Sequence, residues 1–351
     1  MDRIYRELSK DGYEKKVDLY DVIYYYEKLK TNHLFTPKLV LQVLFNAVKR
    51  LFGVSFVKIT QKIKLWHRDV ETYSVLNSTG AIMGIIYFDL EKRDNKLLTS
   101  PLCVHLCYQH KNILGEITIP KAVLVSGYTG MNKSCMTYSD VVSLFREFGV
   151  AIQTIAHSTR EIYQKSDEFA ILMSQILEYV AWEKDIIQNI CEDLDETVYD
   201  HILFTRYINF ANAIKMRCVN SLFDHIIHNS VDFIDTLKLC LKENESPKSL
   251  IQSLYKKIYS EIMSSQKDIV NMDIFGINPS VIHQEINGNE ATLYGSIVIE
   301  ILSFAIYSLV KEGKGKDFIN NVLCTDSSKI KKLIYKFIMG LDGDTYGLYL
   351  H

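Results

Sequence analysis

Apolar residues recur every three or four positions between Asp18 and Phe52, which is the period of an amphipathic helix. Two runs follow this period: DLYDVIYYYEKLK, which starts at Asp18, and PKLVLQVLFNAVKRLF, which starts at Pro37. Proline is tolerated in a first helical turn, because the N–H groups of that turn have no intrahelical acceptor. The pattern therefore predicts two helices within residues 18–52.

Between Val54 and Tyr128 the pattern changes to short runs rich in β-branched and aromatic residues, which are typical of strands. The runs are VSFVKIT, VETYSVL, AIMGIIYFDL, LCVHLCY and KAVLVSGY. Turn-forming residues at 77–80, in KRDNK and around Gly115 separate them. This part of the chain predicts a small, mostly antiparallel sheet.

Beyond Thr137 the helical period returns and continues almost to the end of the chain. Breaks are expected near residues 158–166, 244–247, 275–288 and 313–315. The predicted fold class is therefore mainly α with a small, mostly antiparallel β-sheet near the front. We expect an extension at residues 1–17 and one domain at 18–350, in which 18–136 carries helices and sheet and 137–350 is helical.

Composition excludes some classes of function. The chain has 351 residues, of which 48% are hydrophobic, so it can bury a substantial core. Its 40 Lys and Arg against 42 Asp and Glu leave no single-sign field to attract nucleic acid or an anionic membrane. No run approaches the roughly 18 apolar residues of a membrane span. The first fifteen residues lack a signal-peptide core and contain four acids, which disfavours a transit peptide; a cytoplasmic protein is expected.

Several cysteine and histidine patterns suggest metal binding but have simpler interpretations. The seven cysteines are scattered and predict free thiols. Cys103, His105 and Cys107 would share one face of a strand, with His110 beyond them, yet no second ligand pair has structural-zinc spacing. We favour core cysteines and a hydrogen-bonded histidine there. Two further histidines, His225 and His228, are three residues apart on an expected helix and are interpreted as surface residues.

Two other motifs could be functional but also have purely structural interpretations. The residues 313–316, GKGK, lack the spacing and the preceding strand of a phosphate-binding loop, so they predict a helix-terminating turn. Tyr24, Tyr25 and Tyr26 are compatible with a groove lining and equally with core or interface packing.

The segment VVSLFREFGVAIQ, residues 141–153, resembles the active-site helix of the thimet oligopeptidase and mitochondrial intermediate peptidase family, in which H-E-F-G-H follows a Thr-Leu-Phe lead-in. Other segments resemble further family motifs in the same order. They are DLYDVIYYYEKLK, LWHRDVETYSV, IIYFDLEKRDNK, EFAILMSQILEYVAW and HQEINGNEATLYGS. The resemblance covers about residues 18–350 and corresponds to the C-terminal, catalytic half of a family member. It implies an oligopeptidase-like, zincin-type catalytic-domain fold.

The resemblance also identifies three positions that hold zinc in the family. In an H-E-x-x-H helix two histidines on one face bind the metal, the glutamate activates its water, and a downstream glutamate completes the ligands. Here the ligand positions carry Arg146, Val150 and Ile171, which have no lone pair to donate, while Glu147 remains at the general-base position. We therefore expect neither metal nor cofactor. Glu168 is the alternative, shifted third ligand.

Arg146 is interpreted either as a solvated or carboxylate-paired side chain or as a binding-site cation. The substrate loop of the family is matched by His283, at a position that stabilises the transition state, and by Tyr294. Asn289 and Leu293 stand where other tyrosines are expected.

The function expected from these residues is that of a catalytically inactive, metallopeptidase-like scaffold that binds a protein or peptide. The resemblance implies that a partner covers the surface that the N-terminal half covers in the family, either a second copy, forming a homodimer, or another chain. Two alternatives stay open: a residual metal-dependent oligopeptidase with a non-standard metal site, and a structural subunit of a larger assembly.

Overall fold

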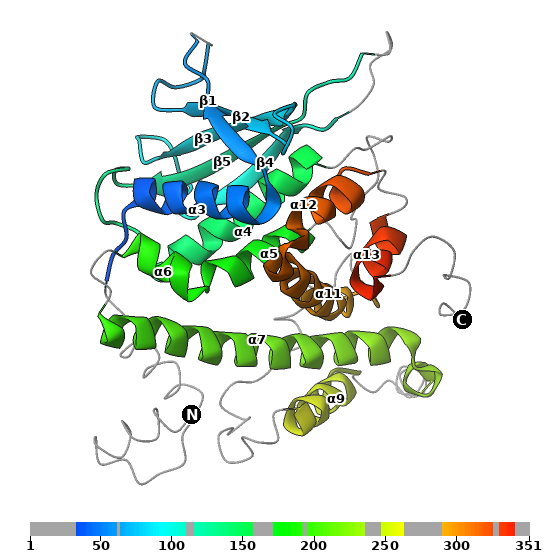
Figure 1. The fold of residues 1–351 in the computed structure, drawn as a ribbon. Helices are drawn as coiled ribbons and strands as arrows, with labels where there is room; N and C mark the ends of the chain where they lie inside the picture. The colour runs from blue at the N-terminus through cyan, green and yellow to red at the C-terminus, as the bar shows by residue number, and fades with distance from the viewer. Residues whose placement is uncertain are drawn as a thin grey trace, which may run out of the picture. The chain divides into compact units, whose positions relative to one another are not determined.

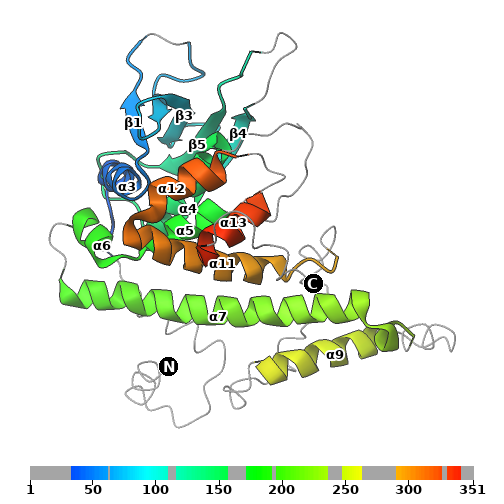
Figure 2. The same cartoon turned by 45° about the vertical axis from the view of Figure 1, so that its right-hand side comes forward.

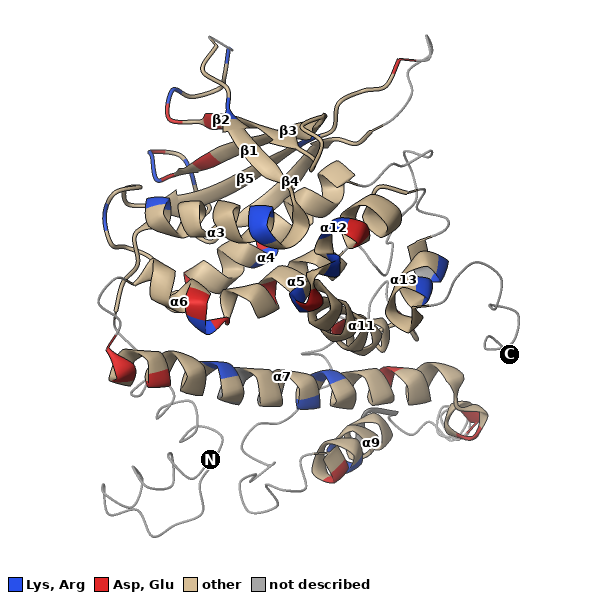
Figure 3. Ribbon diagram, viewed as in Figure 1, with Lys and Arg blue, Asp and Glu red and all other residues tan. Residues whose placement is uncertain are grey.

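The computed structural model describes residues 33–61, 64–109, 116–156, 171–191, 195–235, 247–262, 290–325 and 330–340 (Figure 1). The chain divides into two compact units, residues 32–195 with 299–351 and residues 1–31 with 196–298. Among the described residues, no helix combines the length and apolar character needed to cross a membrane. Acidic and basic residues are interspersed along the drawn elements (Figure 3).

The larger unit contains one five-stranded sheet whose strands coincide with the five runs predicted above. The strands are β1 (Ser55–Lys58), β2 (Glu71–Leu76), β3 (Ile82–Glu91), β4 (Leu102–Cys107) and β5 (Lys121–Tyr128). Their order is β1-β2-β3-β5-β4. Strands β3 and β5 pair in parallel and the other three pairings are antiparallel. The mostly antiparallel sheet is confirmed, and β4 lies at its edge.

Helices α3 (Pro37–Phe52) and α4 (Tyr138–Ala156) lie on the same face of this sheet (Figures 1 and 2). Helix α3 begins at Pro37, as the sequence predicts, and ends where Gly53 adopts φ 71°. Under the sheet, the ring of Phe45 lies 4.5 Å from that of Phe56, 5.6 Å from Phe88 and 5.7 Å from Phe148. These rings form the contact between the two helices and the strands.

The start of α4 is defined by reciprocal hydrogen bonds. The Asp140 carboxylate accepts from the Thr137 N–H at 2.8 Å, and the Thr137 hydroxyl accepts from the Asp140 N–H at 3.3 Å. Such a capping box satisfies N–H groups that the first helical turn leaves without partners. Farther along α4, a Cβ at Gly84 of β3 would lie 2.7 Å from Ile155, so the sheet approaches the helix closely there.

The remaining helices of the larger unit complete its described part. They are α5 (Leu172–Ala181), α6 (Lys184–Ile190), the portion of α11 (Gly295–Leu309) from Ile299 onward, η3 (Val310–Lys314), α12 (Gly315–Phe318), η4 (Ile319–Leu323) and α13 (Ile330–Met339). Gly313 has φ 95° and interrupts the helical path, which confirms the break predicted at 313–315. A Cβ at Gly315 would lie 2.1 Å from the Leu51 carbonyl oxygen, so α12 packs tightly on α3.

The smaller unit contains the long helix α7 (Glu196–Asn229) and α9 (Pro247–Ile262). Its core consists of buried side chains from both helices: Val219, Phe223, Tyr255, Ile258 and Tyr259. The fully buried Asp224 carboxylate accepts from the N–H groups of Ala291 at 3.0 Å and Leu293 at 3.2 Å. This anchors the turn that leads into α11.

Two of the segments that carry the family resemblance meet at Asp89. The Trp66 Nε1–H donates to its carboxylate at 2.8 Å, the Lys96 ammonium donates at 2.8 Å, and the Arg93 guanidinium pairs with both oxygens. The side chains of Asp89 and Lys96 are 6% and 7% exposed. Although burial opposes ionisation, bonds from Arg93, Lys96 and Trp66 hold the pKa of Asp89 well below its usual range.

The Asp89→Asn variant should lower the free energy of unfolding by about 3 kcal/mol, because it leaves the buried Lys96 ammonium and the partly buried Arg93 guanidinium without their anion. Since the pKa of Asp89 is lowered in the folded state, its contribution is present above about pH 4 and is lost as the pH falls. Urea unfolding across this pH range should show that the variant loses part of the wild-type pH dependence. Asp94→Asn, an exposed acid in the same turn, is the matched control and should change little.

Candidate functional site on helix α4

Helix α4 carries two of the three positions that the resemblance aligns with zinc ligands, on a partly exposed face. Phe145, Phe148 and Gly149 are buried against the rest of the larger unit, whereas Arg146 and Val150 are partly exposed. Because these two residues are four apart, they occupy one face of the helix one turn from each other. Arg146 and Val150 therefore share one partly exposed face of α4.

Helix α5 packs against α4 with almost no side chain between the two backbones. A Cβ at Gly149 would lie 2.5 Å from the Met173 carbonyl oxygen and 2.6 Å from the Ser174 Cα. The Gln153 side chain accepts from the Met173 N–H at 2.9 Å, and the Tyr138 hydroxyl donates to the Ala181 carbonyl oxygen. Both helices are therefore held together along their length.

The third position that the resemblance aligns with a zinc ligand, Ile171, lies at the start of α5. Ile171 is the residue before the first helical residue of α5, its carbonyl oxygen accepts from the Gln175 N–H at 3.0 Å, and it is 44% exposed. The backbone contact at Gly149 places the residues that follow Ile171 beside the motif helix. An isoleucine that is nearly half exposed contributes less to the core than the buried side chains around it.

Arg146 pairs with a carboxylate of α5. Its Nε lies 3.5 Å from Glu178 Oε2, and the Gln175 side-chain amide donates to the same oxygen at 3.1 Å. The Arg146 side chain is 43% exposed and that of Glu178 is 21% exposed. The Arg146 guanidinium of α4 therefore faces the partly buried Glu178 carboxylate of α5. Glu178 was not singled out by sequence reasoning.

Glu147 is bonded to the edge strand of the sheet. Its Oε2 accepts from the Cys103 backbone N–H of β4 at 2.7 Å. Burial, and secondarily the negative charge of Glu147, raise the pKa of the Cys103 thiol to about 12. At neutral pH this thiol keeps its proton, and a protonated thiol is a poor metal ligand.

His105 of β4 contacts the same face of α4. Its Nδ1 lies 2.6 Å from Thr154 Oγ1, which donates to the Val150 carbonyl oxygen at 2.8 Å. Either the ring nitrogen or the hydroxyl can be the donor in this contact, according to the tautomer of the imidazole. Burial lowers the pKa of His105, although the charge of Glu147 opposes this shift. Glu147, Val150 and Thr154 lie on one face of α4, so their helical spacing could have identified Thr154 from the sequence.

The other candidate residues do not join this site in the described ranges. Cys107 donates its thiol proton to the Tyr108 carbonyl oxygen at 3.3 Å. The rings of His225 and His228 bond to Asn229 and to Asp224 respectively, within the smaller unit. Residues outside the described part are Tyr24, Tyr25, Tyr26, His110, Glu168, His283 and Asn289. Over the part of the chain that the structure describes, no group of three or more His, Cys, Asp or Glu side chains could hold a metal ion.

The segment that resembles the substrate loop of the family has two described residues among the candidates. Tyr294 is 49% exposed, and the Leu293 N–H is held by Asp224. Both belong to the smaller unit, and the backbone there is anchored by a buried carboxylate. Sequence reasoning gave no sign of this anchor, because Asp224 is nearly seventy residues away along the chain.

Chemically, the arrangement on α4 can pair charges and bind a backbone N–H. The guanidinium of Arg146 and the alkyl groups of Val150 and Ile171 have no lone pair for a divalent cation. The Glu147 carboxylate accepts a hydrogen bond from the Cys103 N–H of β4.

Comparison with known proteins gives the same assignment along nearly the whole chain. A family model described as Peptidase family M3 matches residues 2–340. A probable thimet oligopeptidase of Arabidopsis thaliana is 26% identical over 320 residues, covering 82% of this chain and 41% of that protein. Oligopeptidase A of Haemophilus influenzae is 24% identical over 368 residues, covering 95% of this chain and 50% of that protein. A mitochondrial intermediate peptidase of Yarrowia lipolytica is 27% identical over 163 residues, covering 38% of this chain and 21% of that protein. The chain spans half or less of the length of these relatives.

The Gly149→Ala variant should be destabilised by at least about 2 kcal/mol, because the added methyl group would overlap the Met173 carbonyl and force α4 and α5 apart. Chemical denaturation measures the loss. The matched control is Gly295→Ala at the first residue of α11, where a Cβ has nothing within 4 Å. Equal stability of the two variants would contradict the close packing of α4 on α5.

Proposed function

The chain belongs to peptidase family M3, and from this premise we propose that it is a metal-free member that binds proteins or peptides without hydrolysing them. The observation that carries the proposal is the ion pair between Arg146 and Glu178. A fixed positive charge at a ligand position repels a divalent cation, and the pair satisfies a carboxylate that a metal would otherwise attract.

The ion pair between Arg146 and Glu178 adds little to the stability of the folded chain. Both side chains are partly exposed and their closest atoms are 3.5 Å apart, so the pair contributes at most about 1 kcal/mol. Its main consequence is electrostatic. A lone carboxylate between α4 and α5 would attract cations, and the guanidinium cancels that attraction within the protein.

The state of Glu147 supports the same proposal. A metallopeptidase glutamate takes a proton from a water whose pKa the metal has lowered to about 7. Without a metal the pKa of water is about 15.7, so a carboxylate is far too weak a base to deprotonate it. Here Glu147 accepts from the Cys103 N–H and fixes β4 beside α4. We assign it a structural role in holding the edge strand.

A surface suitable for a partner lies on the other face of β4. Leu102, Val104 and Leu106 alternate along the strand and are 42%, 39% and 50% exposed. Cys103 and His105 point instead toward α4. An apolar stripe on a strand is a typical docking surface, because a partner can bury its exposed side chains. A second copy of the chain is one such partner.

The rival function is a residual metal-dependent oligopeptidase with donors recruited by folding. Its best candidates in the described part of the chain are the Glu147 carboxylate and the His105 imidazole. Two donors do not make a closed protein site for zinc, which takes three or four. The third reading, a structural subunit of a larger assembly, differs from the proposal in the identity of its partner.

Purified wild-type chain should contain far less than one zinc per molecule and should not cleave quenched fluorescent oligopeptides, with or without added zinc, because residues 146, 150 and 171 offer no donors. Elemental analysis and the fluorescence assay measure both quantities. Stoichiometric zinc with chelator-sensitive cleavage would favour the rival.

Fluorescence anisotropy of labelled oligopeptides should show saturable binding to the same preparation. Val104→Asp should weaken this binding. Ile82→Asp, which changes an exposed apolar residue elsewhere on the sheet, should leave it unchanged.

The triple variant Arg146→His, Val150→His, Ile171→Glu should regain about one zinc per chain, because three donors at these positions complete a catalytic-type zinc site. Arg146→His with Val150→His alone is the control, and it should bind zinc much more weakly because the third protein ligand is missing. Circular dichroism verifies that both variants fold. A folded triple variant that binds no more zinc than the control would contradict the alignment of residues 146, 150 and 171 with zinc-ligand positions.

A further inference from the structure

The two faces of the five-stranded sheet differ in what covers them. On one face, the rings of Phe56 and Phe88 pack on Phe45 of α3, and Gly84 lies against Ile155 of α4. On the opposite face, which we call the outer face, the described part of the chain places no helix (Figures 1 and 2). Side chains alternate between the two faces of a strand, so the neighbours of Phe56, Gly84 and Phe88 point to the outer face.

The outer face is continuous from one edge of the sheet to the other. Strand pairing aligns outward side chains of neighbouring strands into rows. One row runs across β1, β2, β3 and β5 through Val57, Ser74, Ile85 and Lys121, and Val104 of β4 lies opposite Val123 of β5. The apolar stripe of β4 described above is therefore one margin of a larger surface.

The outer face is mainly apolar, although a solvated sheet face normally carries polar side chains. At the margin opposite β4, Val57 is 51% exposed. Near the middle, the ring of Trp66 lies 5.5 Å from that of Tyr87, and Trp66 is 52% exposed. A sheet that is apolar on both faces usually has a second layer packed on it.

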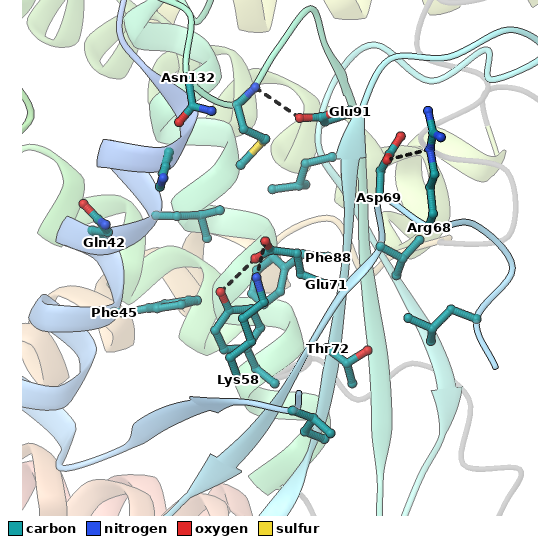
Figure 4. A pocket seen from close by; sticks show the side chains of 18 of the residues that line it. Gln42, Phe45, Lys58, Arg68, Asp69, Glu71, Thr72, Phe88, Glu91 and Asn132 are labelled. Atoms are coloured by element: carbon teal, nitrogen blue, oxygen red, sulfur yellow. Dashed lines mark hydrogen bonds and ion pairs between the residues drawn. The ribbon is translucent and has the colours of Figure 1, made fainter. Parts of the chain in front are cut away.

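The charged side chains of the strands lie elsewhere. Lys58, Glu71 and Glu91 line the pocket between α3 and the sheet, on the helix side (Figure 4). Asp89 points outward but is neutralised by the two cations described above. The remaining charge is that of Lys121, the first residue of β5, whose long side chain can extend to the rim. A charged ligand would find little to pair with on this face, so the face favours an apolar partner.

We propose that the outer face packs against the outer face of a second copy of the chain, sheet on sheet, in a two-fold symmetric dimer. Apolar sheet faces pack on one another with interdigitated side chains, as in β-sandwiches. The described part of the chain contains one sheet, so the second layer comes from another molecule. The inference rests on the proposed function in one respect, because it names the partner of the surface on β4.

A second copy fits this face in size and in charge. Five strands make a face no smaller than the sheets that pair in immunoglobulin-type sandwiches. Two-fold symmetry brings the same patch of each copy together, and homodimer interfaces are apolar and poor in charge at their centre, as this face is. An oligopeptide would instead cover the stripe on β4 and leave Val57 and Trp66 in water.

Sedimentation velocity of the purified full chain over a concentration series tests the proposal. The wild-type chain should sediment as a reversible dimer with twice the monomer mass of 40.6 kDa. Val57→Asp and Val104→Asp replace exposed valines on the two edge strands of the sheet. Each should raise the dissociation constant of the dimer at least about tenfold, because a carboxylate would be buried in an apolar interface. Both valines are exposed, so the variants should keep the melting temperature of a dissociated wild-type chain.

Val231→Asp is the matched control, because Val231 is a valine of the smaller unit that is 70% exposed. It should leave the dissociation constant unchanged. Three results would overturn the dimer: a monomer throughout the concentration series, equal weakening by Val231→Asp, or weakening by Val104→Asp without any by Val57→Asp. The last result would indicate a partner confined to β4.

Failure of the dimer can be told apart from failure of the proposed function. A monomeric chain that binds labelled oligopeptides and lacks zinc would overturn the dimer and leave the proposed function standing. A dimer that holds stoichiometric zinc and cleaves oligopeptides would overturn the proposed function and leave the dimer standing.

Discussion

Helices α4 and α5 meet backbone to backbone at Gly149, and the geometry of the candidate site depends on that contact. A side chain of any size at this position would meet the Met173 carbonyl. Close packing fixes the register of the two helices, since Gln153 can accept the Met173 N–H and Arg146 can reach Glu178 in one relative position. The glycine of the R-E-F-G-V motif thus has a packing role that is separate from metal binding.

The same helix, in a chain of family M3, carries charged side chains at two partly exposed positions. Arg146 supplies a positive charge from within the protein, and Glu147 bonds to the edge of the sheet. The Arg146 guanidinium balances the Glu178 carboxylate of α5, and the Cys103 N–H of β4 bonds to the Glu147 carboxylate of α4. The two interactions are compatible with each other. Under the proposed function, a peptidase fold would bind a partner while positions 146, 150 and 171 carry no metal donors.

Much of the fold could be predicted from local sequence patterns. The start of α3 at Pro37, the five strands and the break at Gly313 are each encoded within a few neighbouring residues. The parallel pairing of β3 with β5 could not be predicted, because the placement of β4 at the edge depends on contacts between distant strands. For the same reason the sequence identified positions 146, 147, 150 and 171 through the family motif but not Glu178, whose role depends on the packing of two helices.

The most direct test of the central claim is anomalous diffraction at the zinc absorption edge from crystals of the wild-type chain soaked in zinc. The account predicts no anomalous peak beside Glu147, with electron density for the Arg146 guanidinium in contact with Glu178. A peak held by Glu147 together with His105 or other donors, with Arg146 turned away from Glu178, would contradict it.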